Sequence, residues 1–139
     1  MPTSEWLQTE LGIPSGGVSL VVTYERGNQT SSMHLPLLQP TLTEWLGGPL
    51  YPGSLNLRAD AAVQFPDPAV RALGGRAWQL AAVVVGERAV GIAARRADSG
   101  DIDFIEVFGR HKIAERLSLH PGARVQLRIL PGWLLESSA

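Results

Sequence analysis

Short runs of alternating apolar and polar residues, separated by Gly and Pro turns, make up most of the chain. Alternation with a period of two is typical of a β-strand with one buried face, and longer apolar runs bounded by turns fit strands buried on both faces. The pattern predicts strands over residues 18–25, 29–35, 54–58, 76–85, 88–94, 101–108 and 123–130. We therefore expect a mainly β fold of about six to seven strands.

Two or three short helices are predicted between these strands. The first spans 4–11, and the second spans 41–46, where a Thr and a Glu have the spacing of a capping box. The third begins at Asp67 as N-cap, with Pro68 at the first helical position, and ends at Gly74. The chain thus reads as a β structure with little helix.

A faint internal repeat adds to this prediction. Residues 42–58 resemble residues 113–128, because each segment reads as a helix, a Pro-Gly turn and a strand. Such a repeat suggests a barrel built from two similar halves, although short amphipathic pieces can also resemble one another by chance.

Composition limits the classes of function. A chain of 139 residues, 45% hydrophobic and 18% charged, fits one domain over 1–139 with a sizeable core. The formal charge of -1 gives no general attraction for nucleic acid, and the absence of cysteine excludes disulfides and thiolate chemistry. No stretch could span a bilayer and no signal peptide is evident, so we expect a cytoplasmic protein without membrane contact, as a monomer or weak homodimer.

One carboxylate lies within an apolar strand. Glu106 stands in the run Phe-Ile-Glu-Val-Phe, and alternation places it on the same face as Phe104 and Phe108. Burying a carboxylate is costly without a compensating cation, so such groups are candidates for general-base or substrate-binding roles. If the strand ends at this point, Glu106 faces solvent instead. The pattern leaves both interpretations open.

Three further polar residues are candidates for phosphate and metal binding. Lys112 is the only lysine in the chain, and as a compact ammonium it could contact a phosphate; a solvated surface lysine is the alternative. Ser54 and Asn56 lie two residues apart on one strand face and offer neutral oxygen ligands to Mg²⁺. Small polar residues after a Pro-Gly turn are also common on the solvent face of a strand.

Two segments resemble the signatures of a known family. Residues 46–57, Leu-Gly-Gly-Pro-Leu-Tyr-Pro-Gly-Ser-Leu-Asn-Leu, resemble the Pro-Gly-Thr-Leu-Asn signature of the archaeal CTP-dependent riboflavin kinases. Residues 105–122 resemble the second signature of that family, and the likeness covers about residues 20–130. The resemblance implies a small cradle-loop β-barrel.

The resemblance also implies a reaction, the Mg²⁺-dependent transfer of the terminal phosphoryl group of CTP to the ribityl hydroxyl of riboflavin, which gives FMN. It assigns Mg²⁺ to Ser54 and Asn56, with serine in place of the family's threonine. It assigns to Glu106 contact with the flavin and the orientation or deprotonation of the acceptor hydroxyl. The nucleotide-binding residues of the family fall on Gly27, Asn28, His111, Lys112 and Ile113.

The sequence departs from the family at the nucleotide. Of the family's glycine-rich loop only Gly27 remains, and Glu25 adds a negative charge beside it. Ala114 replaces an arginine, and the flavin-binding threonine has no counterpart near 97–99. Two other functions therefore stay open. One is a flavin- or nucleotide-binding module without turnover. The other is a barrel that binds nucleic acid or protein through Arg95, Arg96, Arg110 and Lys112.

Overall fold

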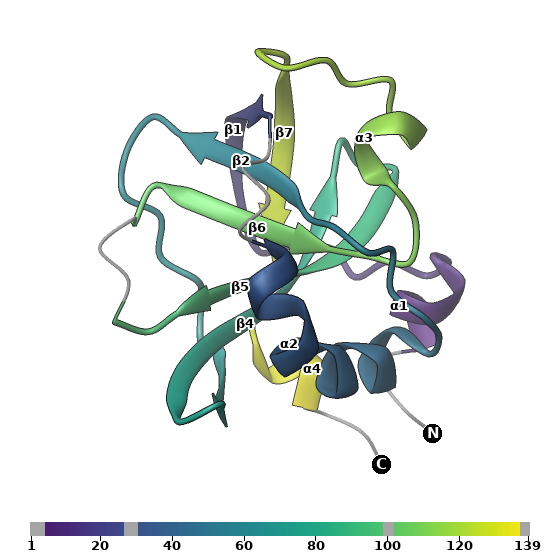
Figure 1. The fold of residues 1–139 in the computed structure, drawn as a ribbon. Helices are drawn as coiled ribbons and strands as arrows, with labels where there is room; N and C mark the ends of the chain where they lie inside the picture. The colour runs from purple at the N-terminus through teal and green to yellow at the C-terminus, as the bar shows by residue number, and fades with distance from the viewer. Residues whose placement is uncertain (1–4, 27–30, 99–101, 137–139) are drawn as a thin grey trace.

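The computed structural model describes residues 5–26, 31–98 and 102–136 (Figure 1). In this part of the chain seven β-strands form one antiparallel sheet. Their bounds are β1 (Val18–Glu25), β2 (Leu55–Ala59), β3 (Ala69–Leu73), β4 (Arg76–Val85), β5 (Ala89–Arg96), β6 (Phe104–Phe108) and β7 (Arg124–Ile129).

The sheet closes into a barrel. Its strand order is β3-β4-β5-β6-β2-β1-β7, and β4 also pairs with β7 from Val83↔Ile129 to Val85↔Leu127. Six strands therefore form a closed ring, and β3 extends it as an extra strand on β4. The prediction of a mainly β barrel of six to seven strands with few, short helices is confirmed.

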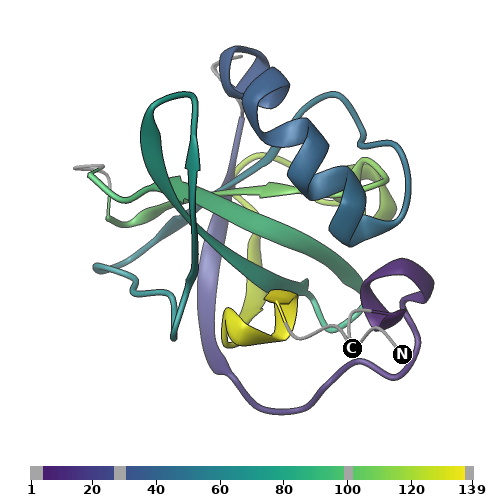
Figure 2. The same cartoon turned by 90° about the horizontal axis from the view of Figure 1, so that it is seen from below.

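Four helices accompany the strands in the described part of the chain. They are α1 (Glu5–Thr9), α2 (Ser31–Leu46), α3 (Ile113–Arg116) and α4 (Trp133–Glu136). Both views show α2 lying along the outside of the barrel (Figures 1 and 2). Among the described residues, no helix has the length and apolar character needed to cross a membrane.

The strands bury two separate sets of side chains. Leu57, Ile105 and Leu127 belong to the set that fills the barrel, which Ile113 of α3 covers at one end. The second set lies between the outer faces of β4 and β5 and the helices α1, α2 and α4. Because β4 and β5 are buried on both faces, they read in the sequence as continuous apolar runs.

The largest correction concerns residues 31–46. The predicted strand over 29–35 is wrong for residues 31–35, which belong to α2, and the predicted helix over 41–46 is only the end of α2. Residues 29 and 30 lie outside the described part. Pro36 and Pro40 stand inside the helix, where each removes a backbone hydrogen bond and hides the helical signal. Burial of Leu38, Leu42 and Leu46, each at most 1% exposed, compensates for that loss.

The predicted helix over 67–74 is also wrong. Residues 69–73 form β3, which pairs with β4 from Ala69↔Leu80 to Leu73↔Arg76. Asp67 has a φ of 42°, whereas an N-cap needs extended backbone, so it cannot begin a helix. Pairing with the long strand β4 outweighs the local Asp-Pro signal.

The other predicted elements agree with the structure in place and type, whereas α4 was not predicted. The strands β1 and β4 have the predicted bounds, while β2, β5, β6 and β7 differ only at their ends. Of the predicted first helix over 4–11, residues 5–9 are helical. The alternation along the chain was therefore a reliable guide wherever no proline or helix cap competed with it.

Candidate functional site

The register of three strands aligns the polar residues of the candidate site. Glu25 of β1 lies opposite Asn56 of β2, and Asn56 lies opposite Glu106 of β6. Since residues paired across a sheet point to the same face, the three side chains form one row on the outside of the barrel. Glu106 in turn lies opposite Ala94 of β5, which packs in the core between barrel and helices.

Ser54 joins two members of this row. Its hydroxyl oxygen Oγ lies 2.8 Å from Oδ1 of Asn56 and 3.3 Å from Oε2 of Glu106, so its single O–H can donate to either acceptor. Ser54 is half-buried just before β2, at the end of the Pro-Gly turn that directs the strand into the sheet. The structure thus brings together Ser54, Asn56 and Glu106, which are up to 52 residues apart in the chain.

Asn56 is only 6% exposed, and it is the one polar or charged side chain that is buried within the described residues. Burying an amide is costly unless its polar atoms find partners, so such a residue in a strand is a candidate for a role beyond packing. Glu106 is half-buried in the middle of β6. It therefore neither ends the strand nor lies free in solvent.

The oxygens of this cluster suit a hard cation. Ligands at adjacent corners of a magnesium octahedron, each about 2.1 Å from the ion, lie about 3.0 Å apart. The 2.8 Å between Oγ of Ser54 and Oδ1 of Asn56 is close to that spacing. With two neutral oxygens and at most one carboxylate from this cluster, a Mg²⁺ ion would keep several positions for water or phosphate oxygens.

A pocket with about 330 Å³ of empty space adjoins the cluster. Ser54 lines it, together with Tyr24 of β1, Tyr51 before β2, and residues 111–114 at the start of α3. The backbone N–H of Tyr51 donates to the carbonyl oxygen of Gly109 at 2.9 Å, which ties the two signature segments to each other.

The predicted nucleotide-binding residues divide into two groups. His111, Lys112 and Ile113 line the pocket, with Lys112 exposed. Ala114 lines it as well, so a methyl group stands where the resemblance would have an arginine. Gly27 and Asn28 lie outside the described residues.

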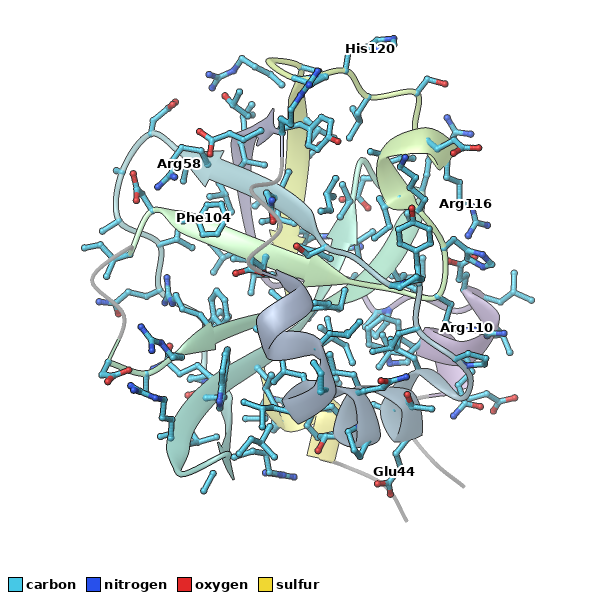
Figure 3. The ribbon with its side chains drawn as sticks, in the orientation of Figure 1. Glu44, Arg58, Phe104, Arg110, Arg116 and His120 are labelled. Carbon is cyan, nitrogen blue, oxygen red and sulfur yellow. The ribbon has the colours of Figure 1, made fainter. Side chains whose placement is uncertain are left out.

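The charge of Glu25 is compensated by an arginine on the next strand. Arg58 Nε and Nη2 donate to the two carboxylate oxygens of Glu25, each at 3.3 Å, and Nη1 donates to Asp103 at 3.0 Å. Its guanidinium also lies over the ring of Phe104, 4.8 Å from the centroid (Figure 3). The hydrogen bond to Glu25 raises the pKa of Arg58 above its ordinary value. The charge of Glu25 is thus paired with a cation on the adjacent strand.

Two arginines connect the pocket rim with α1. Arg110 Nη1 donates to the carbonyl oxygen of Gln8 at 2.9 Å, and Arg116 Nη2 lies 2.8 Å from a carboxylate oxygen of Glu10 (Figure 3). These contacts hold α1 against the segment that contains His111 and Lys112. Arg110 is therefore engaged in a structural contact.

The basic residues considered for nucleic-acid or protein binding do not share one surface. Arg110 and Lys112 follow β6, at the end of the barrel where β2 begins. Arg95 and Arg96 end β5, whose register places them toward the start of β6 and thus at the opposite end. Four basic residues that lie this far apart along the strands do not form a continuous basic groove.

Sequence reasoning missed Tyr24 and Tyr51 as lining residues of the pocket. Tyr24 is an inward-facing residue of β1 and packs partly against the barrel core, so its alternation could have suggested it. Tyr51 precedes the Pro-Gly turn, where no periodicity applies. No model of a known protein family matches the chain, and no curated protein matches it either.

Proposed function

We propose that this protein is a Mg²⁺-dependent phosphotransferase of the riboflavin kinase type, which uses a nucleoside triphosphate, CTP by the resemblance, to convert riboflavin into FMN. One observation carries the proposal. Ser54 Oγ lies 2.8 Å from Asn56 Oδ1 and 3.3 Å from Glu106 Oε2, and Ser54 also lines the pocket that His111 and Lys112 line. In this proposal the metal ligands, the base and the phosphate-binding cation therefore come from one region of the molecule.

In this mechanism Glu106 orients the ribityl hydroxyl and accepts its proton as the hydroxyl oxygen forms a bond to the terminal phosphorus. The bond between that phosphorus and the bridging oxygen breaks, and the nucleoside diphosphate leaves. Lys112 neutralises phosphate charge during the transfer. When bound at Ser54 and Asn56, Mg²⁺ would supply further charge neutralisation for the phosphate oxygens.

The tyrosines of the pocket give it aromatic walls. Tyr24 and Tyr51 line the same space as His111 and Lys112, so a flat ring and a phosphate chain could be held at the two sides of one cavity. This arrangement supports a nucleotide as the occupant of the pocket and leaves the outer face around Glu106 for the acceptor.

A binding module without turnover is the second candidate. It is favoured by Ala114, which gives the pocket wall no charge where the resemblance would have an arginine. This candidate predicts binding of a flavin or a nucleotide without formation of FMN.

The test is a reaction of purified protein with riboflavin, Mg²⁺ and each of CTP, ATP, GTP and UTP, followed by chromatographic separation of FMN from riboflavin. Glu106→Gln should abolish FMN formation. The matched control is Glu44→Gln, which removes an exposed carboxylate from the last turns of α2 (Figure 3) and should leave the rate unchanged. Binding of riboflavin or nucleotide without product would favour the binding module, and no binding of either would overturn both candidates.

A further inference from the structure

A second cavity lies at the end of the barrel opposite the candidate site. It holds about 780 Å³ of empty space that is open to solvent, between the loop after β2 and the ends of β4, β5 and β6. Ser54, Asn56 and Glu106 are not among the residues that line it. The proposed phosphotransfer therefore makes no use of this cavity.

The register of the sheet directs one arginine into this cavity. Arg95 of β5 lies opposite Gln79 of β4, and Gln79 lies opposite Val70 of β3, so the three side chains share one face. Arg95 follows two residues after Ala93, whose side chain is buried inside the barrel. The side chain of Arg95 therefore continues the inward-facing series of β5 into the mouth of the barrel, where it lines the cavity.

Three contacts fix the position of the Arg95 guanidinium. It lies 4.4 Å from the ring centroid of Phe65. Nη1 donates to the carbonyl oxygen of Ile102 at 3.2 Å, and Nη2 donates to Oε1 of Gln79 at 3.4 Å. These two hydrogen bonds hold the guanidinium in place and leave about three of the five N–H groups of an arginine for an incoming acceptor.

The partners of Arg95 within the described residues are all neutral. They are a backbone carbonyl, a side-chain amide and an aromatic ring. Burial lowers the pKa of Arg95 below its ordinary value, but the group stays charged at neutral pH because arginine starts from a very high pKa. A partly buried cation with neutral partners attracts an anion more strongly than an exposed, paired cation does.

The neighbouring arginine points the other way. Arg96 lies opposite Trp78, which packs in the core between barrel and helices, and its Nε lies 3.9 Å from a carboxylate oxygen of Asp98. Successive residues of a strand point to opposite faces, so the guanidinium of Arg96 is directed away from that of Arg95. Of the described residues that line the cavity, Arg95 is therefore the one that presents a charge to it.

The rest of the cavity wall is largely apolar. Val63 and Phe65 line it and are only 6% and 5% exposed, whereas Ile102, which also lines it, is 51% exposed. An exposed isoleucine beside a cation offers apolar surface to a ligand that also carries a negative charge.

We infer that this end of the barrel binds a small apolar monocarboxylate, with the carboxylate on the guanidinium of Arg95 and the apolar body against Ile102 and Val63. One cation matches one negative charge, and the planar guanidinium suits the planar carboxylate. A dianion such as a phosphate monoester would keep one charge unpaired beside apolar walls, which is costly.

The test is calorimetric titration of the full chain with benzoate at pH 7, and with acetate, benzyl alcohol and phenyl phosphate as comparisons. Benzoate should bind saturably and at least about tenfold more tightly than acetate, which lacks the apolar body, or benzyl alcohol, which lacks the charge. It should also bind more tightly than phenyl phosphate. Absence of saturable benzoate binding would overturn the inference, and so would tighter binding of phenyl phosphate or equal affinity for acetate.

Two neighbouring variants place the ligand on one face of β5. Arg95→Gln should weaken benzoate binding at least about tenfold, because it removes a charged hydrogen-bond donor from the ligand. The matched control is Arg96→Gln, which removes the same charge from the next residue, on the opposite face, and should change the affinity at most about twofold. An equal loss in both variants, or no loss in Arg95→Gln, would overturn the inference.

Two further variants test the apolar contact and the location of the ligand. Ile102→Ser shortens a side chain that is already half exposed, so it stays informative even if Arg95→Gln does not fold, and it should weaken benzoate binding about threefold. Lys112→Gln, at the opposite end of the barrel, should have no effect. Unchanged binding in Ile102→Ser, or loss of binding in Lys112→Gln, would overturn the inference. Because the titration uses neither riboflavin nor a triphosphate, its outcome is independent of the proposed kinase activity.

Discussion

The two ends of the barrel hold charge in different ways. At one end, Ser54 lies within hydrogen-bond distance of both Asn56 and Glu106, and Arg58 of β2 compensates the charge of the nearby Glu25. At the other end, the partners described for Arg95 are all neutral. The first arrangement gathers acidic and neutral oxygens, and the second holds a positive charge among neutral partners within the described residues.

The difference follows from which strand face supplies the polar residues. Asn56 and Glu106 point outward, because their neighbours Leu57 and Ile105 fill the barrel. Arg95 continues the inward-facing series of β5 after Ala93, which is buried in the barrel. An inward-facing charge is tolerable only where the barrel opens to solvent, so this arginine can stand at the end of β5 but not in its middle.

The largest expected effect tests whether the two ends share one core. Leu57 is fully buried in the barrel, on the strand that connects both ends. Leu57→Ala should lower the free energy of unfolding by about 2–5 kcal/mol, because it removes buried methyl groups and leaves a cavity. Urea unfolding measures the loss, and ligand binding at both ends should fall together with the folded fraction. Loss of binding at only one end would mean that the ends are stabilised independently.

A substitution of Asn56 should affect only the end of the barrel that holds Ser54 and Glu106. Asn56→Leu removes the amide oxygen and replaces it with an apolar group of similar size in a buried position. If the proposed transfer takes place, we expect its rate to fall at least about a hundredfold. This corresponds to an activation barrier that is about 2.7 kcal/mol higher. Asn56→Asp, which keeps an oxygen ligand, should retain more activity, and an equal loss in both variants would argue against a metal role.

A smaller effect is expected at the rim of the proposed nucleotide pocket. Lys112→Gln removes an exposed cation that lines the pocket, and should raise the Kd of a nucleoside triphosphate about tenfold, or about 1.4 kcal/mol. Fluorescence titration of the pocket with nucleotide and Mg²⁺ measures it. Lys112→Arg keeps the charge and serves as control. An unchanged affinity in Lys112→Gln would show that Lys112 is only a solvated surface residue.

The smallest effect concerns how the stability of the fold depends on pH. Arg128 hydrogen bonds to Glu87 at 3.0 Å and 3.1 Å and lowers the pKa of that carboxyl below its ordinary value of 4.5. A lowered pKa in the folded state gives stability that is present above the unfolded pKa and is lost as pH falls through the folded one. Glu87→Gln should therefore lower the midpoint of urea unfolding slightly at pH 7 and leave it unchanged at pH 3. An equal shift at both pH values would contradict the pairing of Glu87 with Arg128.

Part of the candidate site could be predicted from local pattern. The alternation Ser-Leu-Asn-Leu-Arg places Ser54 and Asn56 on the face opposite Leu55 and Leu57, and the structure has this arrangement. The pairing of Asn56 with Glu106 could not be read in this way. Alternation determines which face a side chain occupies, but strand order and register depend on contacts between residues that are far apart in the chain.

The sequence by itself determined the mainly β character, the bounds of β1 and β4, and the turn that directs β2. These features rest on local alternation and on turn residues, whose conformational preferences act within a few positions. Tertiary structure alone decided that residues 31–46 form a helix despite two prolines, that 69–73 form a strand, and that Arg95 stacks on Phe65. In each case the burial of apolar groups or the pairing of backbone groups against a distant segment outweighed the local preference, because those energies are summed over many contacts.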